Sequence, residues 1–364
     1  MRIVYVLPSL GIGGAERQVV ALSERMRSRG HTVALILLLG RQAVEWPATV
    51  DLLYLDLRLT PAGILAALFR ARRFLRGFRP ELIHSHVFPA NIAGRLFKLL
   101  CPGAVVLSTV HNVYEGGWVR MTAYRLTDFL TRRTIAVSMA AAERYVHLKA
   151  IPARKACVLT NGIDCAEFIP DRERRAKLRA QMETPNEFVW LTAGRIVPAK
   201  DYPNLLHAFA HVLQQFPGTQ LWIAGAASGA ESAEIQVHSA KLGESVRWLG
   251  VRRDMPALLD ASDGFVLASA WEGMPLVLGE AMAMEKPVVA TDVGGVRELV
   301  GGAGILVPAK NPESLAEAML ATMRSSQEER ARSGQAGRER IAAHFSIEAK
   351  ADQWEELYRA NLIA

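Results

Sequence analysis

The stretch FVWLTAGRIVPAKDYPNLLHAF, residues 188–209, decides the fold class of this chain. Its first six residues, apolar except for Thr192, predict a buried strand, while the apolar spacing of its last six predicts a helix. Between them lie Gly194 and two cations, Arg195 and Lys200. Each cation alone would be an ordinary surface charge. After a buried strand, however, the planar guanidinium donors of Arg195 and the mobile ammonium of Lys200 predict a loop that neutralises a diphosphate.

Strands and helices alternate along the whole chain. We expect strands at residues 3–7, 32–39, 82–84, 105–109, 134–137, 188–193, 220–224, 246–249, 264–268 and 287–291. Such alternation predicts parallel sheets with helices on both faces, whose ligands bind beyond the carboxyl ends of the strands. A chain of 364 residues suits two domains, which we place at residues 1–168 and 169–346.

A second segment, AWEGMPLVLGE at residues 270–280, places two carboxylates around a turn that opens a helix. We expect Glu272 in the loop and Glu280 about two turns into the helix. The N–H groups of a helix N-terminus favour a phosphate, Gly273 lets a ligand approach closely, and Pro275 suits the first helical turn. A capped surface helix with an incidental acidic pair is the alternative. The basic loop upstream favours a nucleotide-sugar site.

These segments, together with other short motifs, resemble the retaining glycosyltransferases of the GT-B fold, in family 4. The motifs are GGAE at 13–16, VHN at 110–112, AVS at 136–138, NGID at 161–164, Gly194-Arg195 with Lys200, Glu272 with Glu280, and TDVGGVRE at 291–298. The resemblance implies an α/β protein with two Rossmann-like parallel-sheet domains facing across a cleft. It also implies that the first domain binds the acceptor and the second the donor. A C-terminal helix at about 347–364 would cross back to the first domain, packing through Trp354, Leu357 and Tyr358.

The resemblance also implies the residues of the donor site. Glu280 would accept hydrogen bonds from ribose hydroxyls, and Glu272 would contact sugar hydroxyls. The donor-binding residues would be Gly13, Gly14, Gly194, Arg195, Lys200, Glu272, Gly273, Met274, Pro275, Leu276, Val277 and Glu280. The glycines at 13 and 14 would let their loop close against the donor diphosphate or the acceptor, while Glu16 favours a helix N-terminus.

In the first domain, His111 follows an apolar strand and faces the ligand end of the sheet. The resemblance implies that it contacts the transferred sugar; a histidine that satisfies local backbone groups is the alternative. His86 and Asn112 are candidates for contact with the acceptor, and a structural role for His86 is equally open.

The predicted catalytic residues are Arg195, Lys200, Glu272 and His111. Cleavage of a glycosyl–phosphate bond leaves negative charge on the diphosphate, which the cations can stabilise. We expect front-face attack, in which the leaving phosphate takes the acceptor proton, because the first domain shows no carboxylate at a nucleophile position. We expect no metal and no cofactor, since the cations supply the charge and no Asp-x-Asp pair occurs.

The charge is distributed unevenly. Residues 1–170 contain 22 Lys and Arg against 11 Asp and Glu, whereas residues 171–364 contain 21 against 25. The densest basic run is LFRARRFLRGFR at 68–79, where arginines interleave with large apolar residues in a predicted helix. This run fits a helix on an anionic membrane surface, and equally an amphipathic helix whose apolar face is core. We expect no nucleic-acid partner, because no recognition motif occurs and the second half is acidic.

We expect a cytoplasmic protein that is at most peripheral on the inner face of the plasma membrane. The first residues lack the pattern of a secretory signal, and no apolar run approaches the roughly 20 residues of a membrane span. The three cysteines, Cys101, Cys157 and Cys165, lack metal-ligand spacing and are expected to be reduced thiols.

The predicted function is transfer of a hexose from a UDP- or GDP-sugar to a glycan or a polyprenyl- or lipid-linked acceptor in cell-surface polysaccharide or glycolipid synthesis. Transfer to a soluble small molecule, a nucleotide-sugar-binding subunit without activity and a sugar-nucleotide epimerase are the alternatives. A dinucleotide oxidoreductase is disfavoured, because the third glycine of its fingerprint falls at Glu16 and no acid follows the second strand. The base, the sugar, the acceptor and the linkage stay open.

Overall fold

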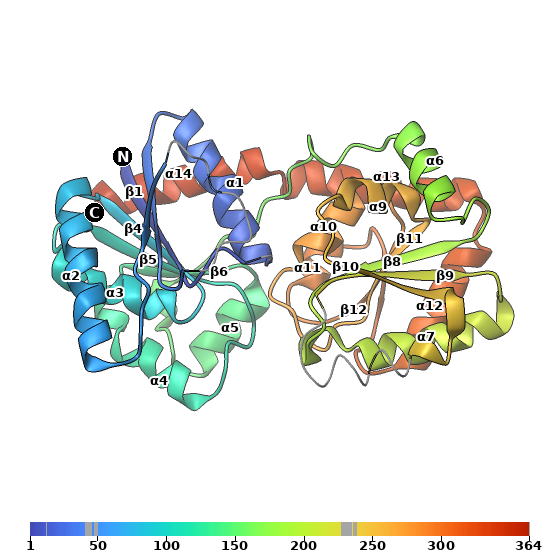
Figure 1. Cartoon of the computed structure of the whole chain (residues 1–364), viewed down its shortest axis with the longest axis horizontal. Coiled ribbons are helices and arrows are strands. Elements are labelled where there is room, and N and C mark those ends of the chain that lie inside the picture. Colours follow the sequence, from blue (N-terminus) through green and yellow to red (C-terminus); the bar gives the residue numbers. More distant parts are fainter. Residues whose placement is uncertain (12, 41–45, 47–49, 227–234, 236–238, 364) are drawn as a thin grey trace. The chain divides into compact units, whose positions relative to one another are not determined.

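The computed structural model of the chain describes residues 1–363 except 12, 41–45, 47–49, 227–234 and 236–238. These residues form two compact units. Unit 1 comprises Met1–Gly162 and Ile347–Ala364, and unit 2 comprises Ile163–Ser346. Figure 1 shows that each unit has a central sheet with helices along its faces, as the alternating strands and helices predict.

The described sheet of unit 1 has seven parallel strands in the order β3-β2-β1-β4-β5-β6-β7. The strands are β1 Arg2–Leu7, β2 Thr32–Leu37, β3 Asp51–Tyr54, β4 Leu82–His86, β5 Val105–Val110, β6 Arg133–Ala136 and β7 Ala156–Val158. The helices are α1 Gly14–Ser28, α2 Pro61–Phe78, α3 Ala90–Leu100, α4 Trp118–Leu126, α5 Met139–His147 and α14 Ile347–Ile363. The strand order reverses between β1 and β4, which is where ligands bind in sheets of this kind.

Strand β1 is covered on both faces because its side chains are apolar at every position from residue 3 onward. Successive side chains of a strand point to opposite faces. Ile3, Tyr5 and Leu7 pack in a core with α1 and α14. Val4 and Val6 pack in a second core with α2 and α3. Continuous apolar runs of this kind are typical of parallel strands buried on both sides.

The described sheet of unit 2 has six parallel strands in the order β10-β9-β8-β11-β12-β13. The strands are β8 Val189–Ala193, β9 Gln220–Ala224, β10 Val246–Gly250, β11 Gly264–Leu267, β12 Val288–Thr291 and β13 Ile305–Val307. The helices are α6 Arg172–Gln181, α7 Tyr202–Gln215, α9 Met255–Ala261, α10 Leu276–Ala283, α11 Val296–Val300, α12 Pro312–Arg324 and α13 Gln327–His344. One core joins β8 and β9 to α7 and α12. Strand order reverses between β8 and β11.

The chain passes from unit 1 to unit 2 after Gly162, earlier than the predicted boundary between residues 168 and 169. Ile163 already belongs to unit 2, because its N–H donates to the carbonyl of Phe345 at 2.7 Å and it forms a parallel bridge with Ser346. Phe168 is buried, and its carbonyl accepts a hydrogen bond of 2.8 Å from Arg338. The intervening turn is thus tied into unit 2.

The C-terminal helix α14 is part of unit 1, as the resemblance implied. Trp354 and Tyr358 are buried in the core that contains β1, and Leu357 packs against that core. Salt bridges from Arg29, in the turn that ends α1, to Asp352 and Glu355 flank this contact. Among the residues that the structure describes, no helix is both long and apolar enough to span a membrane.

Candidate active site

Two loops of unit 2 bring Lys200 and Glu272 together. One loop follows β8 and the other follows β11, the strand beside it in the sheet. Lys200 Nζ lies 2.5 Å from Glu272 Oε1, and the N–H of Ala270 donates to the carbonyl of Ala199 at 2.8 Å. The basic and acidic segments of the sequence therefore meet at the carboxyl ends of two neighbouring strands, where such folds bind ligands.

The Glu272 carboxylate is positioned by hydrogen bonds from residues that could not be singled out from the sequence. Ser269 is buried, and its hydroxyl donates to Glu272 Oε1 at 2.7 Å. The carbonyl of Ser269 in turn accepts a hydrogen bond of 2.6 Å from the hydroxyl of Thr291, at the end of β12. Small hydroxyl residues at strand ends carry little sequence signal on their own. Their role appears only once the three strand ends are placed side by side.

Gly194 follows β8 and lies close to Gly225, the residue after β9. A Cβ atom on Gly225 would come within 1.9 Å of the carbonyl oxygen of Gly194, so any side chain at position 225 would force the two segments apart. The same carbonyl oxygen accepts a hydrogen bond of 2.8 Å from the Tyr202 hydroxyl. The next residue, Arg195, is exposed, and no hydrogen bond or ion pair of its guanidinium is found among the described residues. The guanidinium is therefore accessible to a ligand.

Helix α10 begins later than expected. Pro275 is the residue before the helix, with extended backbone (φ −75°, ψ 106°), rather than a member of its first turn. Glu280 consequently lies just over one turn into the helix, not two. The carbonyl of Gly273 accepts a hydrogen bond of 3.0 Å from the N–H of Gly295. Met274 and Leu276 are buried, so this segment offers backbone rather than side chains to a ligand.

In unit 1, His111 lies at the end of β5 and His86 at the end of the adjacent β4. His86 Nδ1 is 3.0 Å from His111 Nε2. His111 is half-buried, whereas His86 is only 1% exposed. Direct contact between His86 and an acceptor, which the sequence allowed, is therefore blocked by its own burial. His84, beside it, bonds the hydroxyls of Tyr358 and Thr109, both at 2.7 Å, and so has a structural role.

All three histidines are held neutral. Burial lowers the pKa of His111 from 6.5 to about 4. Burial, with the neighbouring imidazoles, also lowers the pKa of His84 and of His86 well below 6.5. Charging any of them would place an uncompensated cation in a desolvated cluster.

A buried acid, Glu115, orders the loop after His111 and was missed by the sequence analysis. Glu115 Oε1 accepts the backbone N–H of His111 at 3.2 Å, and Oε2 accepts the Tyr124 hydroxyl at 2.8 Å. Burial is the main cause that raises the pKa of this carboxyl. Asn112 is half-buried, and its side-chain oxygen accepts the N–H of Tyr114 at 3.3 Å.

The glycine motif of unit 1 lies at the start of α1. Gly13 is the N-cap residue and Gly14 the first helical residue. A Cβ atom on Gly13 would lie 2.2 Å from a carboxylate oxygen of Glu16, which therefore folds back over the loop. This position agrees with a carboxylate favoured by the helix N-terminus. Ile12, within the same motif, lies outside the described residues.

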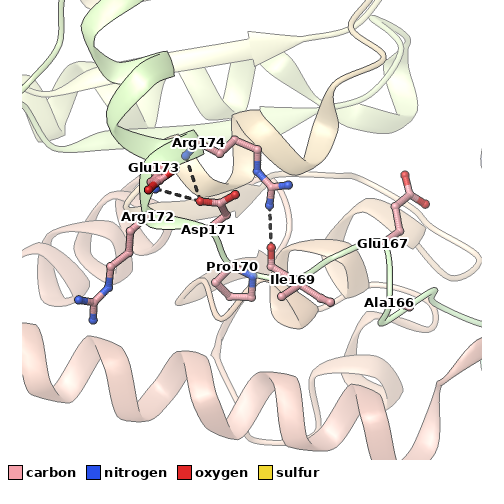
Figure 2. Close-up of a pocket in the computed structure, with 8 residues that line it drawn as sticks. All are labelled: Ala166, Glu167, Ile169, Pro170, Asp171, Arg172, Glu173 and Arg174. Carbon is pink, nitrogen blue, oxygen red and sulfur yellow. Dashed lines mark hydrogen bonds between the residues drawn. The ribbon is translucent and has the colours of Figure 1, made fainter.

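A surface hollow of about 600 Å³ lies elsewhere in unit 2, around the start of α6. Figure 2 shows that Asp171 caps α6 through the N–H groups of Glu173 and Arg174, and that Arg174 donates to the carbonyl of Ile169. None of the predicted site residues lines this hollow. Across the described ranges of the chain, no group of three His, Cys, Asp or Glu side chains is placed to hold a metal ion.

The two parallel sheets with their flanking helices have the fold of the GT-B glycosyltransferases. HepE from Anabaena, solved in complex with UDP and glucose, superposes with a TM-score of 0.85 at 23% identity, covering 98% of this chain and 99% of that one. In sequence, the family described as Glycosyltransferase Family 4 matches residues 12–167, and the family described as Glycosyl transferases group 1 matches residues 187–325.

Two relatives of known description extend this finding. The alpha-maltose-1-phosphate synthase of Mycolicibacterium smegmatis is 33% identical over 322 residues, which are 76% of this chain and 78% of that protein. The UDP-Gal:alpha-D-GlcNAc-diphosphoundecaprenol alpha-1,3-galactosyltransferase of Escherichia coli is 25% identical over 275 residues, 70% of each chain. The chain belongs to glycosyltransferase family 4.

Proposed function

We propose that this glycosyltransferase moves a hexose from a UDP- or GDP-sugar to a glycan or lipid-linked acceptor, with retention of anomeric configuration, in the synthesis of cell-surface polysaccharide or glycolipid. The observation that carries the proposal is the meeting of Lys200 and Glu272 on the loops after β8 and β11, a cation and an acid poised at one ligand-binding edge. A sugar diphosphate carries negatively charged phosphates, which a cation can bind, and several hydroxyls, which a carboxylate can accept hydrogen bonds from.

The chemistry assigned to this edge is stabilisation of the leaving group. Arg195 and Lys200 would neutralise the diphosphate as its charge develops, and Glu272 and Glu280 would bind sugar and ribose hydroxyls. In front-face attack the acceptor oxygen bonds to the anomeric carbon while the bond from that carbon to the phosphate oxygen breaks. The acceptor proton passes to the same phosphate oxygen. This proposal needs neither a metal nor a covalent enzyme intermediate.

The acceptor half of the proposal draws on the named relatives and on the surface of unit 1. The name of the Escherichia coli relative gives UDP-Gal as donor and a diphosphoundecaprenol-linked sugar as acceptor. On the basic helix α2, Ala67, Ala71 and Leu75 are buried and Phe74 and Phe78 pack against the core, whereas Leu65 and Phe69 are exposed. This favours a helix that lies on an anionic membrane, and hence a cytoplasmic, peripheral enzyme. The Mycolicibacterium relative, named for a sugar phosphate, keeps a soluble acceptor as the alternative.

Calorimetry with UDP, GDP and ADP and their common sugar conjugates tests the donor site. We expect micromolar binding of one base, weakened at least tenfold in Glu280→Gln, which preserves side-chain volume. Glu317→Gln, an exposed position on α12, serves as the matched control and should bind as the wild type does. Absence of binding to every nucleotide would refute the proposal. Binding without any release of nucleoside diphosphate over hours, with acceptor lipids present, would favour a non-catalytic subunit.

A further inference from the structure

His86 and His111 form a hydrogen bond whose direction determines what His111 can offer a ligand. His86 Nδ1 lies 3.0 Å from His111 Nε2, and both imidazoles are neutral for the reasons given above. A neutral imidazole has one N–H donor and one lone-pair acceptor. Either His86 or His111 must therefore supply the proton in this bond. The ring that donates keeps a lone pair on its other nitrogen, and the ring that accepts carries its proton on its other nitrogen.

The environment of His86 distinguishes the two arrangements. His86 Nε2 is buried, and it has no hydrogen-bond partner among the described residues. If His111 were the donor, His86 would have to carry its own proton on Nε2, as a buried N–H without an acceptor. If His86 is the donor, Nε2 is a bare lone pair. Buried N–H groups without partners are rarer in proteins than unsatisfied acceptors.

We propose that His86 is a positioning residue that donates Nδ1–H to His111 Nε2 and so fixes His111 as a hydrogen-bond donor through Nδ1–H. The rest of the described unit leaves Nδ1 of His111 without a hydrogen-bond partner, and the side chain is half-buried rather than enclosed. The ligand chemistry that fits is an oxygen acceptor, such as a sugar hydroxyl. This inference rests on the proposed function for the identity of that oxygen, but not for the tautomer.

With its lone pair occupied by His86 and its other nitrogen protonated, His111 has no site at which to receive the acceptor proton. His111 therefore orients the sugar and cannot act as a general base. The proton of the acceptor must leave by another route, which agrees with its transfer to the departing phosphate.

The positions of His86 and His111 are fixed by the sheet and the loop around them. Their strands are adjacent in register, with His86 opposite Thr109. The ring centroids of His84 and His86 lie 3.9 Å apart with the rings tilted by 43°, and His84 is itself hydrogen-bonded through both ring nitrogens. Glu115 accepts the backbone N–H of His111. Turning the ring of His86 would disturb its contact with His84 and its hydrogen bond to His111.

Two-bond ¹H–¹⁵N correlation spectra of ¹⁵N-histidine-labelled protein test the tautomer directly, with His111→Asn and His86→Asn used to assign the two rings among nine histidines. We expect His111 to be protonated on Nδ1 and bare on Nε2 in the wild type. His86→Phe, which keeps an aromatic ring but removes the donor, should abolish this single-tautomer pattern. A wild-type His111 protonated on Nε2 would overturn the proposal, whether or not the variant folds.

Steady-state kinetics of two His86 variants distinguish a positioning role from a packing role. His86→Phe should lower kcat/KM roughly tenfold, the effect of one lost hydrogen bond, whereas His86→Asn should recover most of it because its amide N–H can occupy the place of Nδ1–H. Equal losses in both variants would contradict the inference. If no nucleotide binds and no transfer occurs while His111 still shows Nδ1–H, the tautomer stands and the proposed function fails.

Discussion

The ammonium of Lys200 and the carboxylate of Glu272 form an ion pair of 2.5 Å, and both side chains are largely buried, with exposed fractions of 19% and 11%. A donor diphosphate that reaches this edge would compete with Glu272 for Lys200. In the proposed reaction the pair would hold Lys200 in position until the phosphate replaces the carboxylate as its partner. Glu272 would then be released toward the sugar hydroxyls.

Replacement of Lys200 by methionine should lower kcat by roughly 10²–10³, because it removes one of the charges proposed to stabilise the leaving phosphate. Steady-state transfer rates measure the effect, and circular dichroism checks the fold. Lys177→Met, at an exposed position of α6, is the control and should retain the wild-type rate. A Lys200→Met enzyme within about threefold of wild type would remove Lys200 from the catalytic set.

The close approach of Gly225 to Gly194 predicts a second effect at the same edge. Gly225→Ala would place a methyl group 1.9 Å from the carbonyl oxygen of Gly194 and push aside the loop that carries Arg195. We expect a loss of about 1–3 kcal/mol in the free energy of unfolding, with a fall in transfer rate. Urea unfolding measures the first quantity. Gly218→Ala, where nothing lies within 4 Å of the new Cβ, should leave both unchanged.

Much of this fold could be predicted from sequence, and the strands that escaped prediction share one property. The missed strands β3, β7 and β13 all lie at the edges of the two sheets. Edge strands are half-exposed and short, so they lack the continuous apolar runs that identified the central strands.

Only the site residues that belong to recognisable sequence motifs could be predicted. Lys200 and Glu272 could be paired by charge and chain order, and the structure brings them together. Ser269 and Glu115 act by supporting other residues, and nothing in their local sequence marks that role. The role of His86 depends on burial and on the absence of a partner for Nε2, which are properties of the packed sheet.

The pKa of His111 predicts how activity and stability depend on pH. Burial lowers this pKa from 6.5 to about 4, so the ring stays neutral above pH 4. We expect kcat/KM to show no acid limb near pH 6.5 that depends on His111. A limb with that midpoint that vanishes in His111→Asn would contradict the neutral, donating imidazole.

Stability should respond in the same pH window. Between pH 6.5 and about 4 the unfolded chain binds a proton at residue 111 that the folded protein does not. The free energy of unfolding should therefore fall as pH drops through this window, and less steeply in His111→Asn. Urea unfolding at a series of pH values measures the slope.

Removal of divalent ions should leave the reaction intact. The positive charge proposed for the leaving phosphate comes from Arg195 and Lys200. Transfer rates in excess EDTA should therefore stay within about twofold of those with Mg²⁺ present. Activity that disappears with chelator and returns with Mg²⁺ or Mn²⁺ would show that a metal supplies the charge instead.

The exposed face of α2 predicts binding to anionic membranes. Leu65 and Phe69 are 70% and 68% exposed, and the arginines at 72 and 73 on the next turn are exposed as well. An apolar face flanked by cations can insert at the headgroup boundary, each cation contributing about 1 kcal/mol. Wild-type protein should therefore co-sediment with vesicles of anionic lipid at low salt, and less at high salt.

Charge reversal on α2 should weaken this binding selectively. Arg72→Glu with Arg73→Glu should reduce the partition coefficient roughly 30-fold or more at low salt, since at least about 2 kcal/mol of attraction is lost. The matched control is Arg172→Glu with Lys177→Glu, an equal charge change at exposed positions of α6 in unit 2. Equal loss in both variants would mean that net charge, not the α2 face, drives association. Wild-type protein that stays in the supernatant would favour a soluble acceptor.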